Sequence, residues 1–149
     1  MNDWPDIAGR LAGGVHVLPV RVYFEDTDFS GIVYYANYLK FIERGRSDFL
    51  RLLGVHHSEL AKQGLAFAVR RVEADYLRPA HIDDVLQVHT SLAELRGARF
   101  VLRQKVFRDS EILFEAKVTA ALLTLEGRPR RLPADMRQRF EAFLASPVL

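Results

Sequence analysis

The second half of the chain alternates apolar and polar residues with the two-residue period of β-strands. The alternation is clearest over residues 111–125, where all even positions from Ile112 to Leu122 are apolar. Residues 66–78, 84–95 and 99–108 are similar, and short connections with turn-forming residues separate these segments. Short connections between long strands predict antiparallel hairpins, so we expect an antiparallel sheet here, with a further strand over Val17–Phe24.

The segment from about Ala36 to Leu53 has a different period and is predicted to be a long amphipathic helix. Its apolar residues recur at helical spacing: Tyr38, Phe41, Ile42, Phe49, Leu52 and Leu53. Gly45 falls on the same face, where its missing side chain predicts close approach of a neighbouring element, and Gly54 is placed to end the helix. A face this apolar needs a large cover, which a sheet can provide.

Two shorter helices are also expected. One covers Ser58–Gln63, with Ser58 as N-cap and Gly64 after its end. The other starts at Pro133, a residue tolerated in the first turn, and carries an apolar face made of Met136, Phe140, Phe143 and Leu144.

These elements predict an α+β fold in which one antiparallel β-sheet wraps around a long central α-helix. Residues 1–15 are poorly patterned and contain two adjacent glycines, so we expect a flexible N-terminal lead-in. Residues 16–145 are expected to form a single domain. The edge strands of such a sheet favour pairing with another copy, which predicts a homo-oligomer, either a dimer or a tetramer.

Composition narrows the class of protein. Of the 149 residues, 49% are hydrophobic and 27% are charged, and the net charge is +2. The sequence contains no cysteine, which excludes disulfides and cysteine thiolate chemistry. A charge this small gives no reason to expect nucleic-acid binding. The sequence shows no secretory leader and no apolar run near the ~20 residues of a membrane helix, so we expect a cytoplasmic protein without membrane insertion.

The candidate chemistry lies in residues 23–38. Glu25, Asp26 and Asp28 precede Gly31, and an aromatic run then leads into the long helix. The start of a helix offers unpaired N–H groups and partial positive charge, while a carboxylate offers a base or a nucleophile, so together they predict an acyl-transfer site. The alternative is that Asp28 only caps a helix or loop. Asp26 is predicted to be structural, holding the loop through local hydrogen bonds.

Other catalytic and metal-binding patterns are missing from the sequence. No G-x-S-x-G nucleophile elbow, glycine-rich phosphate loop or HExxH motif occurs. The histidines lack metal-ligand spacing and are expected at surface or loop positions: His16, His56, His57, His81 and His89. We therefore expect no metal site.

The run from Glu25 to Tyr38 resembles the signature of the hotdog-fold acyl-CoA thioesterases. The nearest group is that of the 4-hydroxybenzoyl-CoA thioesterases, including the Tol-Pal-system-associated branch. The resemblance covers roughly residues 18–140 and continues in Glu43–Arg46, Tyr76–Ala80 and Pro129–Pro133. It implies a hotdog fold and hydrolysis of an acyl-CoA thioester to free acid and coenzyme A. Coenzyme A is then part of the substrate, and no separate cofactor is expected.

The resemblance also implies roles for particular residues. Asp28 matches the catalytic carboxylate, acting as general base or as nucleophile, and the backbone N–H of Tyr35 matches the group that polarises the carbonyl. Many members of the Tol-Pal-associated branch have histidine in place of Tyr35. Gly31 and Tyr34 are expected to shape the substrate site. Arginine forks fit phosphate geometry, and the candidates for the coenzyme A phosphates are Arg70, Arg71, Arg130 and Arg131.

A non-catalytic function on the same fold is the alternative. The arginine-rich second half would suit a protein that binds acyl carrier protein, which is acidic, or a phospholipid-synthesis complex. A dehydratase on this fold would need a histidine and glutamate pair near the helix start, which the sequence lacks. Acyl-chain length and type are left open by the sequence.

Overall fold

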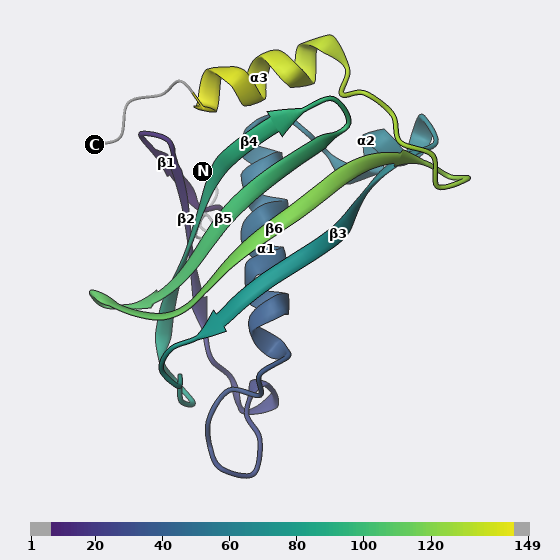
Figure 1. The fold of residues 1–149 in the computed structure, drawn as a ribbon. Helices are drawn as coiled ribbons and strands as arrows, with labels where there is room; N and C mark the ends of the chain where they lie inside the picture. Colours follow the sequence, from purple (N-terminus) through teal and green to yellow (C-terminus); the bar gives the residue numbers. More distant parts are fainter. Residues whose placement is uncertain (1–6, 145–149) are drawn as a thin grey trace, which may run out of the picture.

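A single curved sheet wraps around one long helix in the computed structural model, which describes residues 7–144 (Figure 1). The predicted arrangement of a sheet around a central helix is confirmed. The elements are β1 (Arg10–Ala12), β2 (Val15–Arg21), the short 3-10 helix η1 (Phe24–Asp26), α1 (Asn37–Leu52), α2 (His57–Lys62), β3 (Leu65–Tyr76), β4 (Val85–Arg96), β5 (Arg99–Arg108), β6 (Glu111–Thr124) and α3 (Ala134–Leu144).

The sheet is antiparallel throughout and has the order β1-β2-β4-β5-β6-β3. The hairpins predicted for β4–β5 and β5–β6 are present. The hairpin predicted for residues 66–78 and 84–95 is wrong, because the crossover carrying α1 places β3 at the far edge beside β6, while β4 pairs with β2. One edge of β3 therefore has no partner strand within residues 7–144. Val69 and Val72 near its middle are 48% and 39% exposed, so this edge is both unpaired and partly apolar.

The core lies between the concave face of the sheet and the helices. Phe41 and Ile42 of α1 are almost fully buried against sheet residues such as Val88. Nearer the end of α1, Phe49 packs against Phe140 of α3. The close approach predicted at Gly45 is confirmed, because a Cβ atom there would lie 2.7 Å from a methyl carbon of Val88.

A buried polar chain also joins α1 to the sheet. The Gln104 amide is fully buried and donates to the carbonyl of Ile42 at 2.8 Å and to Thr90 Oγ1 at 2.9 Å. Its carbonyl oxygen accepts from Arg46 Nη1 at 3.0 Å. Since an unpaired buried amide costs free energy, these bonds fix how α1 sits on the sheet.

The N-terminal region differs from the sequence prediction. Residues 1–6 of the expected lead-in lie outside the described residues, but residues 10–12 of it form strand β1, which pairs with β2 through a turn at Gly13, whose φ of +60° suits glycine. His16, predicted to lie at the surface, is fully buried. The prediction was wrong because β2 directs this side chain under α1, where His16 Nε2 lies 2.7 Å from Asp48 Oδ2.

Two smaller predictions need correction. Ser58 lies inside α2, whose N-cap is His56, because the helix begins one residue earlier than expected. Leu144, expected on the apolar face of α3, is 47% exposed, while the other predicted apolar positions of that helix are buried. None of the helices within residues 7–144 is long and apolar enough to cross a bilayer.

Candidate active site

The loop before α1 is held in shape by Asp26. This carboxylate is buried, and its oxygens accept from the backbone N–H of Tyr23 at 2.8 Å and from Asn37 Nδ2 at 3.0 Å. The carbonyl of Asp26 accepts from the N–H of Tyr34 at 2.9 Å. The predicted structural role of Asp26 is confirmed, because these bonds tie both ends of the loop to the first residue of α1.

Asp28 lies two residues further on, at an exposed position in a tight turn. Gly31, at a φ of +82°, donates its N–H to the carbonyl of Asp28 at 3.0 Å. The carboxylate oxygen Oδ1 accepts from Ser30 Oγ at 2.5 Å and from Ser30 N–H at 2.8 Å. The Ser30 hydroxyl and then its N–H lower the pKa of Asp28 from its ordinary value of 3.8, so the carboxylate is ionised at neutral pH.

The alternative predicted for Asp28 is that it only caps a helix or loop. Its hydrogen bonds with Ser30 are of the loop-capping kind. The carboxylate does not cap α1, whose N-cap is Ala36 without a side-chain hydrogen bond. Both hydrogen bonds from Ser30 reach Oδ1, and the backbone N–H of Ile32 also lowers the pKa of the carboxyl group. The side chain is exposed, so the carboxylate is accessible for chemistry.

The start of α1 presents free backbone donors. A turn over Tyr34–Asn37, closed by the bond from Asn37 N–H to the carbonyl of Tyr34 at 2.8 Å, leads into the helix. The N–H groups of Tyr35 and Ala36, at the centre of this turn, have no hydrogen-bond partner among residues 7–144. They lie at the helix end that carries partial positive charge, which favours a developing negative charge there.

Asp28 and Tyr35 line the same cavity, which has a volume of about 430 Å³. Its other walls are aromatic and apolar: Ile32, Val33, Tyr34, Tyr38, Tyr76 and the segment 77–79. The predicted Tyr34 is thus present at the site, and Gly31 shapes the turn beside it. The sequence alone did not mark Tyr76 as a site residue: Tyr76 belongs to the segment Tyr76–Ala80 that continues the family resemblance, but no local pattern shows that it meets the start of α1.

A network of ion pairs and hydrogen bonds around Arg108 holds the segment 77–84, whose first three residues form one wall of the cavity. Arg108 donates to Asp84 Oδ2 at 2.8 Å, to Glu111 Oε1 at 2.7 Å and to the carbonyl of Pro79 at 3.2 Å. Partial burial opposes ionisation of Asp84, but the bonds from His81 N–H and Arg108 outweigh it and lower its pKa. Both charges thus persist at neutral pH, and the cavity wall is fixed to the end of β5.

The predicted phosphate-binding arginines do not surround Asp28 within one chain. Arg70 and Arg71 lie on the edge strand β3, where a bulge leaves Arg70 without a paired position and Arg71 Nη2 contacts Glu73 Oε1 at 2.6 Å. Arg130 and Arg131 are exposed in the connection between β6 and α3. That connection lies at the opposite end of α1 from the loop that carries Asp28 (Figure 1).

Comparison with known families supports a common origin. Residues 22–140 match the Thioesterase-like superfamily. The chain belongs to this family. It is 40% identical over 124 residues to the acyl-CoA thioesterase YbgC of Haemophilus influenzae, covering 82% of this chain and 91% of that protein. It is 37% identical to the acyl-CoA thioester hydrolase YbgC of Escherichia coli, covering 83% and 93% of the two chains.

The fold of this thioesterase-family chain is also shared with solved structures. A probable thioesterase from Bartonella henselae superimposes with a TM-score of 0.77 at 48% sequence identity, over 80% of this chain and 99% of that one. The predicted hotdog fold and the predicted relationship to acyl-CoA thioesterases are confirmed by these matches.

Proposed function

We propose that this thioesterase-family protein hydrolyses acyl-CoA to free acid and coenzyme A, with Asp28 and the start of α1 as its catalytic groups. The observation that carries the proposal is that an ionised carboxylate, Asp28, and a residue with an unpartnered backbone N–H at the start of α1, Tyr35, line one cavity within residues 7–144. The names of the YbgC relatives support the reaction class.

The chemistry follows from the charges at the two sides of the cavity. A thioester carbonyl placed between them would accept a hydrogen bond from Tyr35 N–H, and one such donor stabilises a tetrahedral oxyanion by ~2.7–4 kcal/mol. Asp28 either deprotonates a water that attacks the carbonyl carbon or attacks that carbon itself, forming an anhydride that water then opens. In both routes the thiolate of coenzyme A leaves, and neither route uses a metal or a redox cofactor.

A second copy of the chain completes the site in this proposal. The unpaired, partly apolar edge of β3 is suited to antiparallel pairing with the same edge of another copy about a two-fold axis. Antiparallel pairing sets the Leu65 end of one β3 against the Tyr76 end of the other. The partner's Arg130 and Arg131, near the Leu65 end, would then approach the cavity of Asp28 and bind the coenzyme A phosphates.

The direct test measures thiol release by the purified protein from short aliphatic, long aliphatic and aromatic acyl-CoAs. Wild-type protein should turn over at least one class, and Asp28→Asn, which keeps the shape but removes the charge, should lower kcat by at least about 100-fold. Ser110→Ala, a change at an exposed turn outside the cavity, serves as the matched control. Near-normal turnover by a folded Asp28→Asn protein would remove Asp28 from the mechanism.

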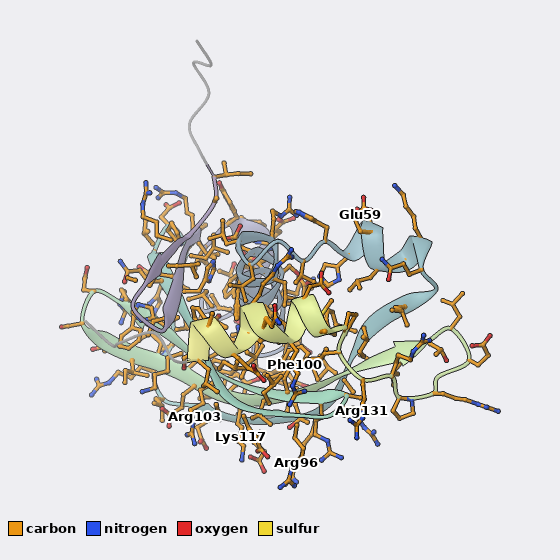
Figure 2. The ribbon with its side chains drawn as sticks, turned by 90° about the horizontal axis from the view of Figure 1, so that it is seen from above. Glu59, Arg96, Phe100, Arg103, Lys117 and Arg131 are labelled. Atoms are coloured by element: carbon orange, nitrogen blue, oxygen red, sulfur yellow. The ribbon has the colours of Figure 1, made fainter. Side chains whose placement is uncertain are left out.

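A non-catalytic partner of acyl carrier protein is the second candidate. Figure 2 shows Arg96, Arg103 and Lys117 projecting from the outer side of the sheet, away from α3, while Phe100 lies beneath that helix. The same face also carries Glu73, Asp75 and Glu115, and its cations would suit an acidic carrier protein. A stable complex with carrier protein combined with no hydrolysis of any thioester would favour this function. Cytoplasmic location and an association with the Tol-Pal system remain predictions.

A further inference from the structure

Tyr76 links the edge strand β3 to the start of α1. It is the last residue of the strand, and its hydroxyl donates to the carbonyl oxygen of Tyr35 at 2.9 Å. Its ring also meets the rings of Tyr35, Tyr38 and Phe114, with centroid distances of 6.2, 5.6 and 5.0 Å. A residue more than 40 positions along the chain thus holds the backbone next to the unpartnered donors.

The geometry of the peptide unit gives this contact a consequence for the donors. In a trans peptide the C=O and the following N–H point in opposite directions, so holding the oxygen sets the direction of the N–H. The bond from Asn37 N–H to the carbonyl of Tyr34 therefore orients the N–H of Tyr35. The bond from Tyr76 to the carbonyl of Tyr35 orients the N–H of Ala36 in the same way.

The two peptide units are consecutive and share the Cα atom of Tyr35. In each unit the carbonyl oxygen accepts a hydrogen bond, from Asn37 in the first and from Tyr76 in the second. In each unit the N–H group has no partner within residues 7–144. Asp26 anchors the same turn from its other side through Asn37. Without Tyr76 the second peptide unit would have no restraint at its oxygen, and the turn could rotate away from the position that a developing oxyanion requires.

We infer that Tyr76 is a positioning residue that, through the carbonyl of Tyr35, holds the turn carrying the oxyanion-binding N–H of Tyr35 and the free N–H of Ala36 beside it, an inference that rests on the proposed thioester hydrolysis. The hydroxyl acts as a hydrogen-bond donor and does not transfer a proton. Burial, and then the proximity of Tyr35, raise the pKa of Tyr76, so the hydroxyl keeps its proton throughout the range in which the protein would work.

The test is Tyr76→Phe, which keeps the aromatic packing and deletes only the hydroxyl. We expect kcat for the best acyl-CoA substrate to fall about 5- to 20-fold, with KM changed less than about twofold, because the lost bond acts on the transition state. The affinity for a non-hydrolysable thioether of coenzyme A should stay unchanged. Tyr23→Phe, which removes the same group from an exposed tyrosine outside the cavity, serves as the control and should retain wild-type kcat.

Backbone amide signals provide a second measurement that does not depend on activity. In ¹⁵N-labelled protein, Tyr76→Phe should shift the amide resonances of Tyr35 and Ala36, while Tyr23→Phe should leave both unchanged. Unaltered kcat, unaltered amide resonances, or a rise in KM without a loss of kcat would each overturn the inference. The proposed function fails separately, if folded wild-type protein hydrolyses none of the thioesters.

Discussion

Two impaired variants of this protein should restore each other's activity when they share a dimer. Asp28→Asn removes the carboxylate, and the double change Arg130→Gln with Arg131→Gln removes two guanidinium groups. Under the proposed pairing of β3 edges, each active site takes Asp28 from one subunit and both arginines from the other. A mixed dimer therefore contains one site with all three native residues and one site that lacks all three.

The length of β3 makes the prediction specific. Phe67 pairs with Leu122, whose carbonyl accepts from Arg130 N–H at 2.8 Å, while Tyr76 lies in the cavity of Asp28. At ~3.3 Å per residue, the strand between Phe67 and Tyr76 spans about 30 Å. A chain's own arginines are thus placed at the wrong end of the strand to serve its own Asp28.

The expected magnitudes follow from the exposure of the arginines. Allowing about 1 kcal/mol for each exposed guanidinium on a phosphate, the double arginine variant should raise KM for acyl-CoA about 30-fold. A thioester of N-acetylcysteamine lacks the nucleotide, so its KM should not change. Random reassociation of equal amounts yields mixed dimers as half of the population, and recovery should reach about a quarter of wild-type kcat/KM.

The assay mixes the two variants under mild denaturant, restores native conditions and follows thiol release at low substrate concentration. Each variant treated alone provides the baseline, and light scattering confirms the dimer. A mixture whose activity equals the mean of the two separate variants would refute the cross-subunit arrangement. Loss of discrimination between acyl-CoA and the N-acetylcysteamine thioester would identify the arginines as the phosphate-binding groups even in that case.

Three further predictions concern pH and packing. Because Ser30 lowers the pKa of Asp28, the acid decline of kcat/KM should be centred below the ordinary carboxyl value of 3.8, and Ser30→Ala should move the decline to higher pH. Burial lowers the pKa of His16 in the folded state, so the free energy of unfolding should fall as pH drops below 6.5, the pKa of histidine in the unfolded chain. Chemical denaturation at several pH values should show a flatter dependence for His16→Gln. Gly45→Val should lower the free energy of unfolding by at least about 2 kcal/mol, because Val88 leaves no room for a side chain. Arg44→Val, on the exposed side of the same helix, should change it by less than about 1 kcal/mol. Equal effects of the two changes would contradict the close packing at Gly45.

The sequence by itself determined the elements and the motif. The helical spacing of Phe41, Ile42 and Phe49 predicted α1, because one apolar face repeats with the period of the helix. Strict alternation over residues 111–125 predicted β6 for the same local reason. Asp28, Gly31 and Tyr35 are close neighbours along the chain, so their meeting at the helix start also follows from sequence.

Only the tertiary structure decided which distant residues meet. Tyr76 reaches the carbonyl of Tyr35 because the crossover through α1 places the end of β3 beside the helix start. His16 is buried because β2 directs its side chain under α1, where it forms a hydrogen bond with Asp48. No local sequence pattern around either residue predicts this contact. Hydrophobic period fixes how each segment folds, but the partners of its side chains depend on strand order, which no short-range pattern encodes.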